Sequence, residues 1–261
     1  MRGPSKAIAV VMAAVVATAL AIIVWLATGR DADVRRPNAS GNADRPIALF
    51  TSLPIYWGEA HDLGAMIGGK AAPHWARQAI ERERQLRPLD TLDADALDGA
   101  RDLLLVQPRP LSPDENVALD EWVAGGGRAL LFADPALTED SAYAIGDPRR
   151  HQDVVLLSPI LGRWGLALEF DDDQPLGERA VRLGDGATIP VNLPGRFAVR
   201  TAGRGDAACT VAAEALVADC RVGAGRILAI ADAALFERGA VGATPQRRAA
   251  LKALLERAFA R

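Results

Sequence analysis

The sequence predicts an α/β domain with a doubly wound, mainly parallel sheet, an antiparallel β insertion and one N-terminal transmembrane helix. Three observations predict it. After residue 46, short strands that are apolar throughout alternate with helical patterns, which is typical of a parallel sheet covered on both faces. Between 180 and 222, Gly, Pro and Asp separate short extended pieces, which is typical of hairpins. An uncharged apolar run fills residues 7–27.

The run 7–27 is long enough to cross a bilayer. At 1.5 Å per residue its helix is about 31 Å long, against a hydrocarbon core of roughly 30 Å. Arg2 and Lys6 precede it, and Trp25 lies near its far end. A cleaved secretory signal is the alternative, although signal cores usually have about 7–15 apolar residues. We expect an uncleaved, single-pass anchor in the cytoplasmic (inner) membrane, with residues 1–6 in the cytoplasm and the C-terminal domain in the periplasm.

Residues 28–45 predict a flexible linker, because they hold Gly, Pro, Asn, Asp and Arg with almost no apolar residues. Residues 46–261 predict the α/β domain, with an insertion at 136–222. The expected central strands are 47–50, 86–89, 102–107, 128–133 and 225–232. The expected helices are 73–83, a segment opening at 112–115, 159–164 and 245–259, and the expected antiparallel pieces are 188–191, 197–200 and 208–211.

One helix start is marked strongly. Ser112 can cap the helix, Pro113 suits its first position, and Glu115 can complete a capping box. The glycines 125–127 end the helix before the next strand.

Composition excludes several function classes. The formal charge is 30 − 33 = −3, which is too acidic for non-specific nucleic-acid binding. The two cysteines exclude a disulfide-dense scaffold and a four-cysteine zinc site. The three histidines are scattered, and no Gly-x-Ser-x-Gly nucleophile elbow occurs. We therefore expect no catalytic residue, no metal and no cofactor.

Polar residues follow the ends of the predicted parallel strands, where α/β sheets bind ligands. The expected ligand-binding cleft is formed by Ser52, Tyr56, Glu59, Gln107, Arg109, Asp134 and Asp232. The alternative, which we prefer for Asp134 and Asp232, is that these carboxylates brace the turns that follow them.

Cys209 and Cys220 lie in the hairpin region at a spacing that suits neighbouring strands. Outside the cytoplasm they could form a disulfide, and two buried thiols are the alternative.

Four segments together carry a family resemblance: 104–112, 119–128, 130–135 and 223–232. Their order of strand, turn, helix, glycine pair, strand and Asp-Pro resembles the GldG-like auxiliary subunits of ABC-type transport systems. The resemblance implies a flavodoxin- or class I glutamine amidotransferase-like fold that lacks the catalytic triad. It covers about 46–135 and 223–235. Unlike those proteins, this sequence shows no second apolar span.

From the anchor and the resemblance we expect a non-enzymatic accessory or ligand-sensing subunit of an ABC-type transport system, whose partners are the membrane and the permease or ATPase subunits. Two alternatives remain. One is an envelope hydrolase that uses Glu59 and Asp134 as acid and base, with Arg109 orienting the substrate. The other is a module that binds an anionic ligand at Arg109.

Overall fold

The computed structural model describes residues 45–58, 73–184, 186–238 and 243–260. The chain divides into two compact units, 1–42 and 43–261, and every described residue belongs to the second. The expected transmembrane segment 7–27 lies outside the described residues. In the part of the chain that is described, no helix is both long enough and apolar enough to cross a membrane.

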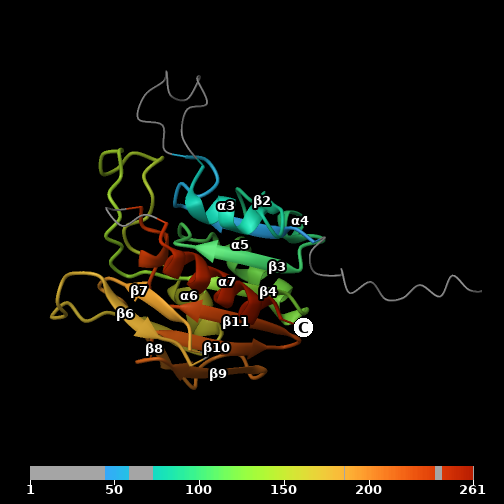
Figure 1. The fold of residues 1–261 in the computed structure, drawn as a ribbon. Coiled ribbons are helices and arrows are strands. Elements are labelled where there is room, and N and C mark those ends of the chain that lie inside the picture. The colour runs from blue at the N-terminus through green and yellow to red at the C-terminus, as the bar shows by residue number, and fades with distance from the viewer. Residues whose placement is uncertain (1–44, 59–72, 185, 239–242, 261) are drawn as a thin grey trace, which may run out of the picture. The chain divides into compact units, whose positions relative to one another are not determined.

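Seven strands form one mixed sheet in the order β2-β1-β3-β4-β11-β10-β9 (Figure 1). The first five are parallel, and their order corresponds to the flavodoxin-like arrangement 2-1-3-4-5. The predicted α/β class with a mainly parallel sheet is therefore confirmed. The strands are β1 (Ile47–Thr51), β2 (Leu86–Pro88), β3 (Asp102–Val106), β4 (Arg128–Phe132), β9 (Ala207–Ala212), β10 (Val217–Val222) and β11 (Gly225–Ile230).

Helices cover both faces of this sheet. Right-handed crossovers leave β1 in one direction and β2 and β3 in the other, which places α3 on the face opposite α4 and α5. Helix α7 contacts α3, so these two form one helical layer. Helix α5 contacts both α4 and α6, so these three form the other. The helices are α3 (Trp75–Glu81), α4 (Ala94–Leu97), α5 (Pro113–Ala124), α6 (Ser158–Arg163) and α7 (Pro245–Phe259), with a short 3-10 turn η1 (Ala234–Phe236) after β11.

Strands β3 and β4 are buried along their whole length because they are covered on both faces. Their continuous Leu, Val and Phe runs are therefore the source of the strand signal in the sequence. At the start of α5 the capping box is present as predicted: Ser112 Oγ accepts from the Glu115 backbone, and the Glu115 carboxylate accepts from the Ser112 backbone.

The insertion is partly different from the expectation. It contains two antiparallel pairs, β5 (Leu166–Glu169) with β8 (Arg196–Val199) and β6 (Arg179–Arg182) with β7 (Thr188–Val191). Strands β9 and β10, however, extend the main sheet, since β10 pairs antiparallel with β11. The apolar side chains of β10 are buried when it joins the main sheet, because they then lie on the core. The free edge of β11 supplies the backbone hydrogen bonds for this pairing.

A buried ionic network ties the amino ends of β3 and β4 together. Asp102 is fully buried, and its Oδ1 accepts from Arg128 Nε at 2.7 Å while its Oδ2 lies 2.6 Å from Arg84 Nη2. Arg128 also donates to the carbonyls of Phe259 and Ala260, at the end of α7. One carboxylate therefore holds two strands and, through Arg128, the closing helix.

We expect Asp102→Ala to lower the free energy of unfolding by about 3 kcal/mol, because it leaves two largely buried guanidinium groups without their counter-charge. Urea denaturation followed by circular dichroism measures this loss. Asp98→Ala, at an exposed position at the end of α4, is the control and should change the stability by less than about 0.5 kcal/mol. Equal stability of the two variants would contradict the role given to Asp102.

Candidate functional site

The crevice between the carboxyl ends of β1 and β3 is the topological switch point, where flavodoxin-like sheets bind ligands. Ser52 and Gln107 lie there as predicted. Ser52 Oγ donates to the Gln107 carbonyl at 2.5 Å and accepts from the Gln152 backbone at 3.1 Å. The loop between β4 and α6 therefore reaches into the crevice that a ligand would otherwise occupy.

Gln107 is the residue that closes this crevice. Its side chain is fully buried, and Nε2 donates to the carbonyls of Asp134 and Gln152 while Oε1 accepts from the Asp134 backbone. Its backbone has a φ of 43°, in the left-handed region that non-glycine residues rarely adopt. This sharp turn after a central strand is where an α/β hydrolase carries its nucleophile, but an amide is not a nucleophile.

Asp134 and Asp232 follow the neighbouring strands β4 and β11, and each carboxylate binds two backbone N–H groups. Asp134 accepts from Ala136 and Ala233, at 2.8 and 2.9 Å. Asp232 accepts from Ala234 and Asn192, at 2.7 and 2.9 Å. Both side chains are buried. They therefore brace the turns beyond the strands, and neither reaches the surface of the domain.

Burial raises the pKa of both carboxyls, and the negative charges of neighbouring carboxylates add to the shift. The pKa of Asp134 rises to about 7, through burial and then the nearby charge of Glu237, against the backbone hydrogen bonds. The pKa of Asp232 is also raised, through burial, then the charge of Asp134, and to a smaller degree that of Glu237. These are the acids whose protonation the fold perturbs most strongly in this direction among the described residues.

Glu237 is the third carboxylate of this group, and sequence reasoning missed it. It is half-buried, just after η1, and burial raises its pKa, with the charge of Glu139 adding to the rise. Its Oε1 accepts from Thr138 Oγ1 at 2.6 Å, and Thr138 Oγ1 accepts from Asn192 Nδ2 at 2.8 Å. The only sequence signal was its position five residues after Asp232, which does not distinguish it from a solvated loop residue. We call Asp134, Asp232 and Glu237 the carboxylate cluster.

Arg109 lies apart from the carboxylate cluster, at the start of α5. Its guanidinium forms a two-pronged ion pair with Glu115, with Nη–Oε distances of 2.7 and 2.9 Å, and it also donates to the carbonyls of Asp90 and Pro110. Hydrogen bonds from Arg109 lower the pKa of Glu115 to about 2. Arg109 thus has a structural partner for both Nη groups and clamps the capped end of the helix.

Of the two remaining predicted cleft residues, Tyr56 and Glu59, the structure describes only Tyr56. Tyr56 packs beneath Arg77 of α3, whose guanidinium carbon lies 3.9 Å from the ring centre. Arg77 also donates to the Tyr56 carbonyl. Glu59 lies outside the described residues, so the expected pairing of Glu59 with Asp134 has no geometry here.

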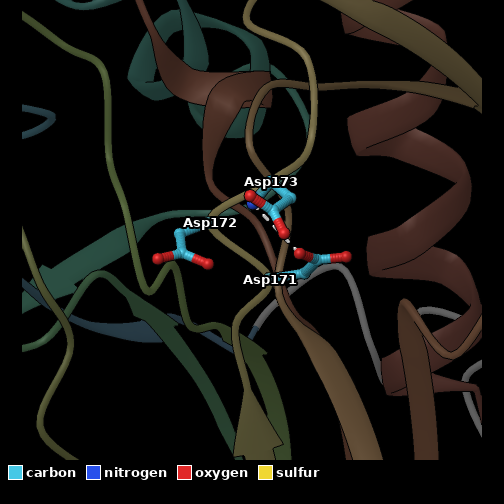
Figure 2. A group of neighbouring side chains, drawn as sticks. All are labelled: Asp171, Asp172 and Asp173. Carbon is cyan, nitrogen blue, oxygen red and sulfur yellow. Dashed lines mark hydrogen bonds between the residues drawn. The ribbon is translucent and has the colours of Figure 1, made fainter.

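Three consecutive aspartates form the group of potential metal ligands in the described part of the chain. Figure 2 shows Asp171, Asp172 and Asp173 on the loop that follows β5, where one oxygen from each lies within 4.8 Å of the others. All three are exposed, and Asp171 Oδ1 accepts from the Asp173 backbone at 3.0 Å. Calcium takes about six to eight oxygen ligands, so three carboxylate oxygens supply only part of a coordination shell.

Cys209 and Cys220 are joined by a disulfide, with a Cα–Cα distance of 4.1 Å. They are directly opposite each other on the antiparallel strands β9 and β10. The bond therefore fixes the register of the edge strand against the rest of the sheet.

Solved structures with a similar fold include glycosidases. An exo-β-1,4-mannosidase from an Opitutaceae bacterium is 14% identical, with a TM-score of 0.42, over 82% of this chain and 36% of its own. A β-galactosidase from Bacillus circulans is 11% identical, with a TM-score of 0.46, over 82% and 31%. A putative ThuA-like protein from Bacteroides uniformis is 9% identical, with a TM-score of 0.43, over 80% and 88%. The chain spans about a third of the length of the two glycosidases.

No family model matches the chain. No curated protein matches it either. Nothing in these comparisons supports the assignment to the GldG-like family.

The expected function is corrected by these findings. We correct the expectation of a non-enzymatic accessory subunit of an ABC-type transport system: the solved structures reported above are two glycosidases and a ThuA-like protein, and none of the three is a transport subunit. The expectation that the chain has no enzymatic activity is withdrawn together with that role. Strand, helix and glycine signals common to this fold carried the resemblance, and such signals reflect packing more than function.

The raised pKa of Asp134 predicts a specific pH dependence. The folded chain keeps this proton up to about pH 7, whereas the ordinary pKa is 3.8, so the stabilisation by this carboxyl is present at low pH and is lost as the pH rises between those values. Between pH 5 and pH 7.5, the free energy of unfolding of the wild-type protein should therefore fall by on the order of 1 kcal/mol or more relative to that of Asp134→Asn.

Urea denaturation of both proteins at the two pH values measures this difference. Leu176→Ala, at an exposed position without a titratable group, is the control and should follow the wild type at both. A wild-type-to-Asn difference that stays constant with pH would show that Asp134 is ionised throughout.

Proposed function

We propose that this chain is a hydrolase whose acid–base chemistry is performed by the carboxylate cluster, with Glu237 as the catalytic residue. The observation that supports the proposal is the placement of three carboxyls with raised pKa values beyond the ends of two adjacent parallel strands. Perturbed carboxyls at this edge of an α/β sheet are typical of active sites.

Glu237 is assigned the contact with substrate because it is the member of the cluster that is only half-buried. A raised pKa brings its proton transfer closer to neutral pH, where a general acid or base works best. Thr138 and Asn192 fix its orientation through the row of hydrogen bonds that ends on Oε1. These two are positioning residues.

Asp134 and Asp232 are assigned a supporting role. Both are buried, and burial raises their pKa values, with a smaller contribution from the charge of Glu237. Since interaction between charges is mutual, ionisation of either one disfavours ionisation of Glu237. Asp134 accepts from the backbone of Ala233 and Asp232 from that of Ala234, so together they hold the start of η1, the turn that precedes Glu237.

The proposed reaction is the addition of water across a bond of the substrate. Ionised Glu237 takes a proton from water as the water oxygen bonds to the electrophilic centre. The bond to the leaving group then breaks, and the proton moves from Glu237 to the leaving group, which restores the carboxylate. No other reactant is consumed.

Purified full-length protein assayed on chromogenic glycosides, esters, amides and phosphates tests the proposal. We expect turnover on at least one class and a loss of about 10² or more in kcat for Glu237→Gln, which is the typical contribution of a general acid–base. Glu256→Gln, at a comparably sized but exposed glutamate on α7, is the matched control and should keep wild-type turnover. The absence of turnover on all four classes, or unchanged turnover in Glu237→Gln, would refute the proposal.

We also propose that the described domain works outside the cytoplasm, held by the apolar segment 7–27 as a membrane anchor. The disulfide supports this, because structural disulfides persist in oxidising compartments and are rare in the cytosol. The length of the apolar segment and the basic residues before it support the same orientation.

Thiol labelling of the protein in its native cells tests the location. We expect a maleimide reagent added after acid quenching to label Cys209 and Cys220 only when a reductant is added first. A cysteine-free chain that carries Leu176→Cys, an exposed position, is the control and should be labelled without reduction. Labelling of the wild-type cysteines before reduction would place the domain in a reducing compartment.

A further inference from the structure

A groove between α5 and α6 lies apart from the carboxylate cluster and has the size of a ligand site. Its volume is about 510 Å³, within the roughly 300–1,000 Å³ typical of small-molecule sites. Helix α5 supplies one wall, α6 supplies the other, and Arg204 comes from the loop after β8. Val117 and Ile160 give this groove an apolar component.

The charge at the base of the groove is fixed by Asp120. Its Oδ1 accepts from Trp164 Nε1, and its Oδ2 accepts from Arg163 Nε and lies 2.8 Å from Arg204 Nη1. Burial by itself raises the pKa of Asp120, but the hydrogen bonds from Arg204, Arg163 and Trp164 together lower it, so this carboxylate stays ionised. Arg204 is also paired with Asp206. The Asp120 carboxylate and the Arg204 guanidinium therefore already have partners within the protein.

Arg163 differs from Arg204 because only its Nε is used. Its side chain is 56% exposed, and among the described residues neither Nη group has a hydrogen-bond partner. A guanidinium whose two Nη groups are open can bind a carboxylate through two parallel hydrogen bonds. The guanidinium of Arg163 is therefore fixed by Asp120 through Nε, and its two Nη groups are available to a ligand in the groove.

Two acceptors line the same groove. Asn116 Nδ2 donates to the carbonyls of Leu111 and Ser112, which fixes the orientation of the amide and leaves its buried Oδ1 with no donor among the described residues. Glu121 lines the groove one helical turn further along α5, exposed and without an ion pair to any described residue. The protein covers Asn116 Oδ1, so of these two residues Glu121 is the one whose acceptors a ligand in the groove can reach.

We propose that the α5–α6 groove binds a small zwitterion, an apolar amino acid or a short peptide with both termini free. Arg163 binds its carboxylate, Glu121 accepts from its ammonium group, and Val117 and Ile160 contact its side chain. The site complements both charges of such a ligand, whereas a simple anion would leave Glu121 unpaired beside it. This proposal does not depend on the hydrolase activity.

Isothermal titration calorimetry of the full-length protein tests the proposal with four probes: leucine, the dipeptide Leu-Leu, N-acetyl-leucine and leucine amide. We expect leucine or Leu-Leu to bind, which distinguishes the amino acid from the peptide. N-acetyl-leucine lacks the ammonium group and leucine amide lacks the carboxylate, so each should bind at least tenfold more weakly. Equal binding of either blocked probe, or no binding of the two free ones, would overturn the proposal.

Two substitutions locate the binding. Arg163→Gln should weaken the free probe at least tenfold, and Arg163→Lys should weaken it less, because lysine keeps the charge but loses the two-pronged geometry. Asp120 keeps Arg204 and Trp164 in both variants, so the urea midpoint should stay near that of the wild type. Arg200→Gln removes an arginine of matched exposure, 55%, that is paired with Glu169 elsewhere, and should bind as the wild type does. Unchanged affinity in Arg163→Gln would refute the site.

Discussion

The central strands of this protein are covered on both faces, so the backbone groups just beyond their ends lie in the interior, where they must find partners other than water. Side chains supply those partners. Gln107 binds the backbone of Asp134 and Gln152 beyond β3 and β4. Asp134 and Asp232 each bind two backbone N–H groups beyond β4 and β11. These contacts fix the first residues of the segments that follow β3, β4 and β11.

The same constraint decides where chemistry can occur. Because Gln107 and Ser52 hold the β4–α6 loop in the switch-point crevice, the usual ligand position of a flavodoxin-like sheet is filled by the protein itself. Reactive groups are displaced by one strand, to the ends of β4 and β11. There the buried aspartates serve as braces, and we propose that the half-buried Glu237 is the member of the cluster that contacts a substrate.

Opposite ends of the sheet use charge in different ways. At the amino ends, Asp102 is compensated by Arg84 and Arg128, so charge serves cohesion. At the carboxyl ends, backbone N–H groups bind the oxygens of Asp134 and Asp232, and burial raises the pKa values of these two carboxyls. Charge therefore stabilises the amino end of the sheet, whereas the carboxyl end keeps protonated acids, and it is there that we propose the reaction occurs.

Local signals in the sequence determined most of the elements. The Leu-rich run at 102–106 specified a strand buried on both faces, and Ser112, Pro113 and Glu115 specified the start of α5, because these signals act within one turn or one strand. Helix α7 was predicted at its observed bounds from Pro245 to Phe259. The positions of Ser52, Gln107, Asp134 and Asp232 at strand ends followed from the same patterns.

Tertiary structure alone decided what those strand-end residues do. That Gln107 fills the crevice, that Arg109 is bound by Glu115, and that Glu237 joins two aspartates all depend on contacts between loops far apart in the chain. Strands β9 and β10 joined the main sheet for a similar reason, since an edge is available only once the sheet exists. Strand and cap signals are local and can be read one segment at a time, whereas burial and charge coupling arise only when separate segments meet.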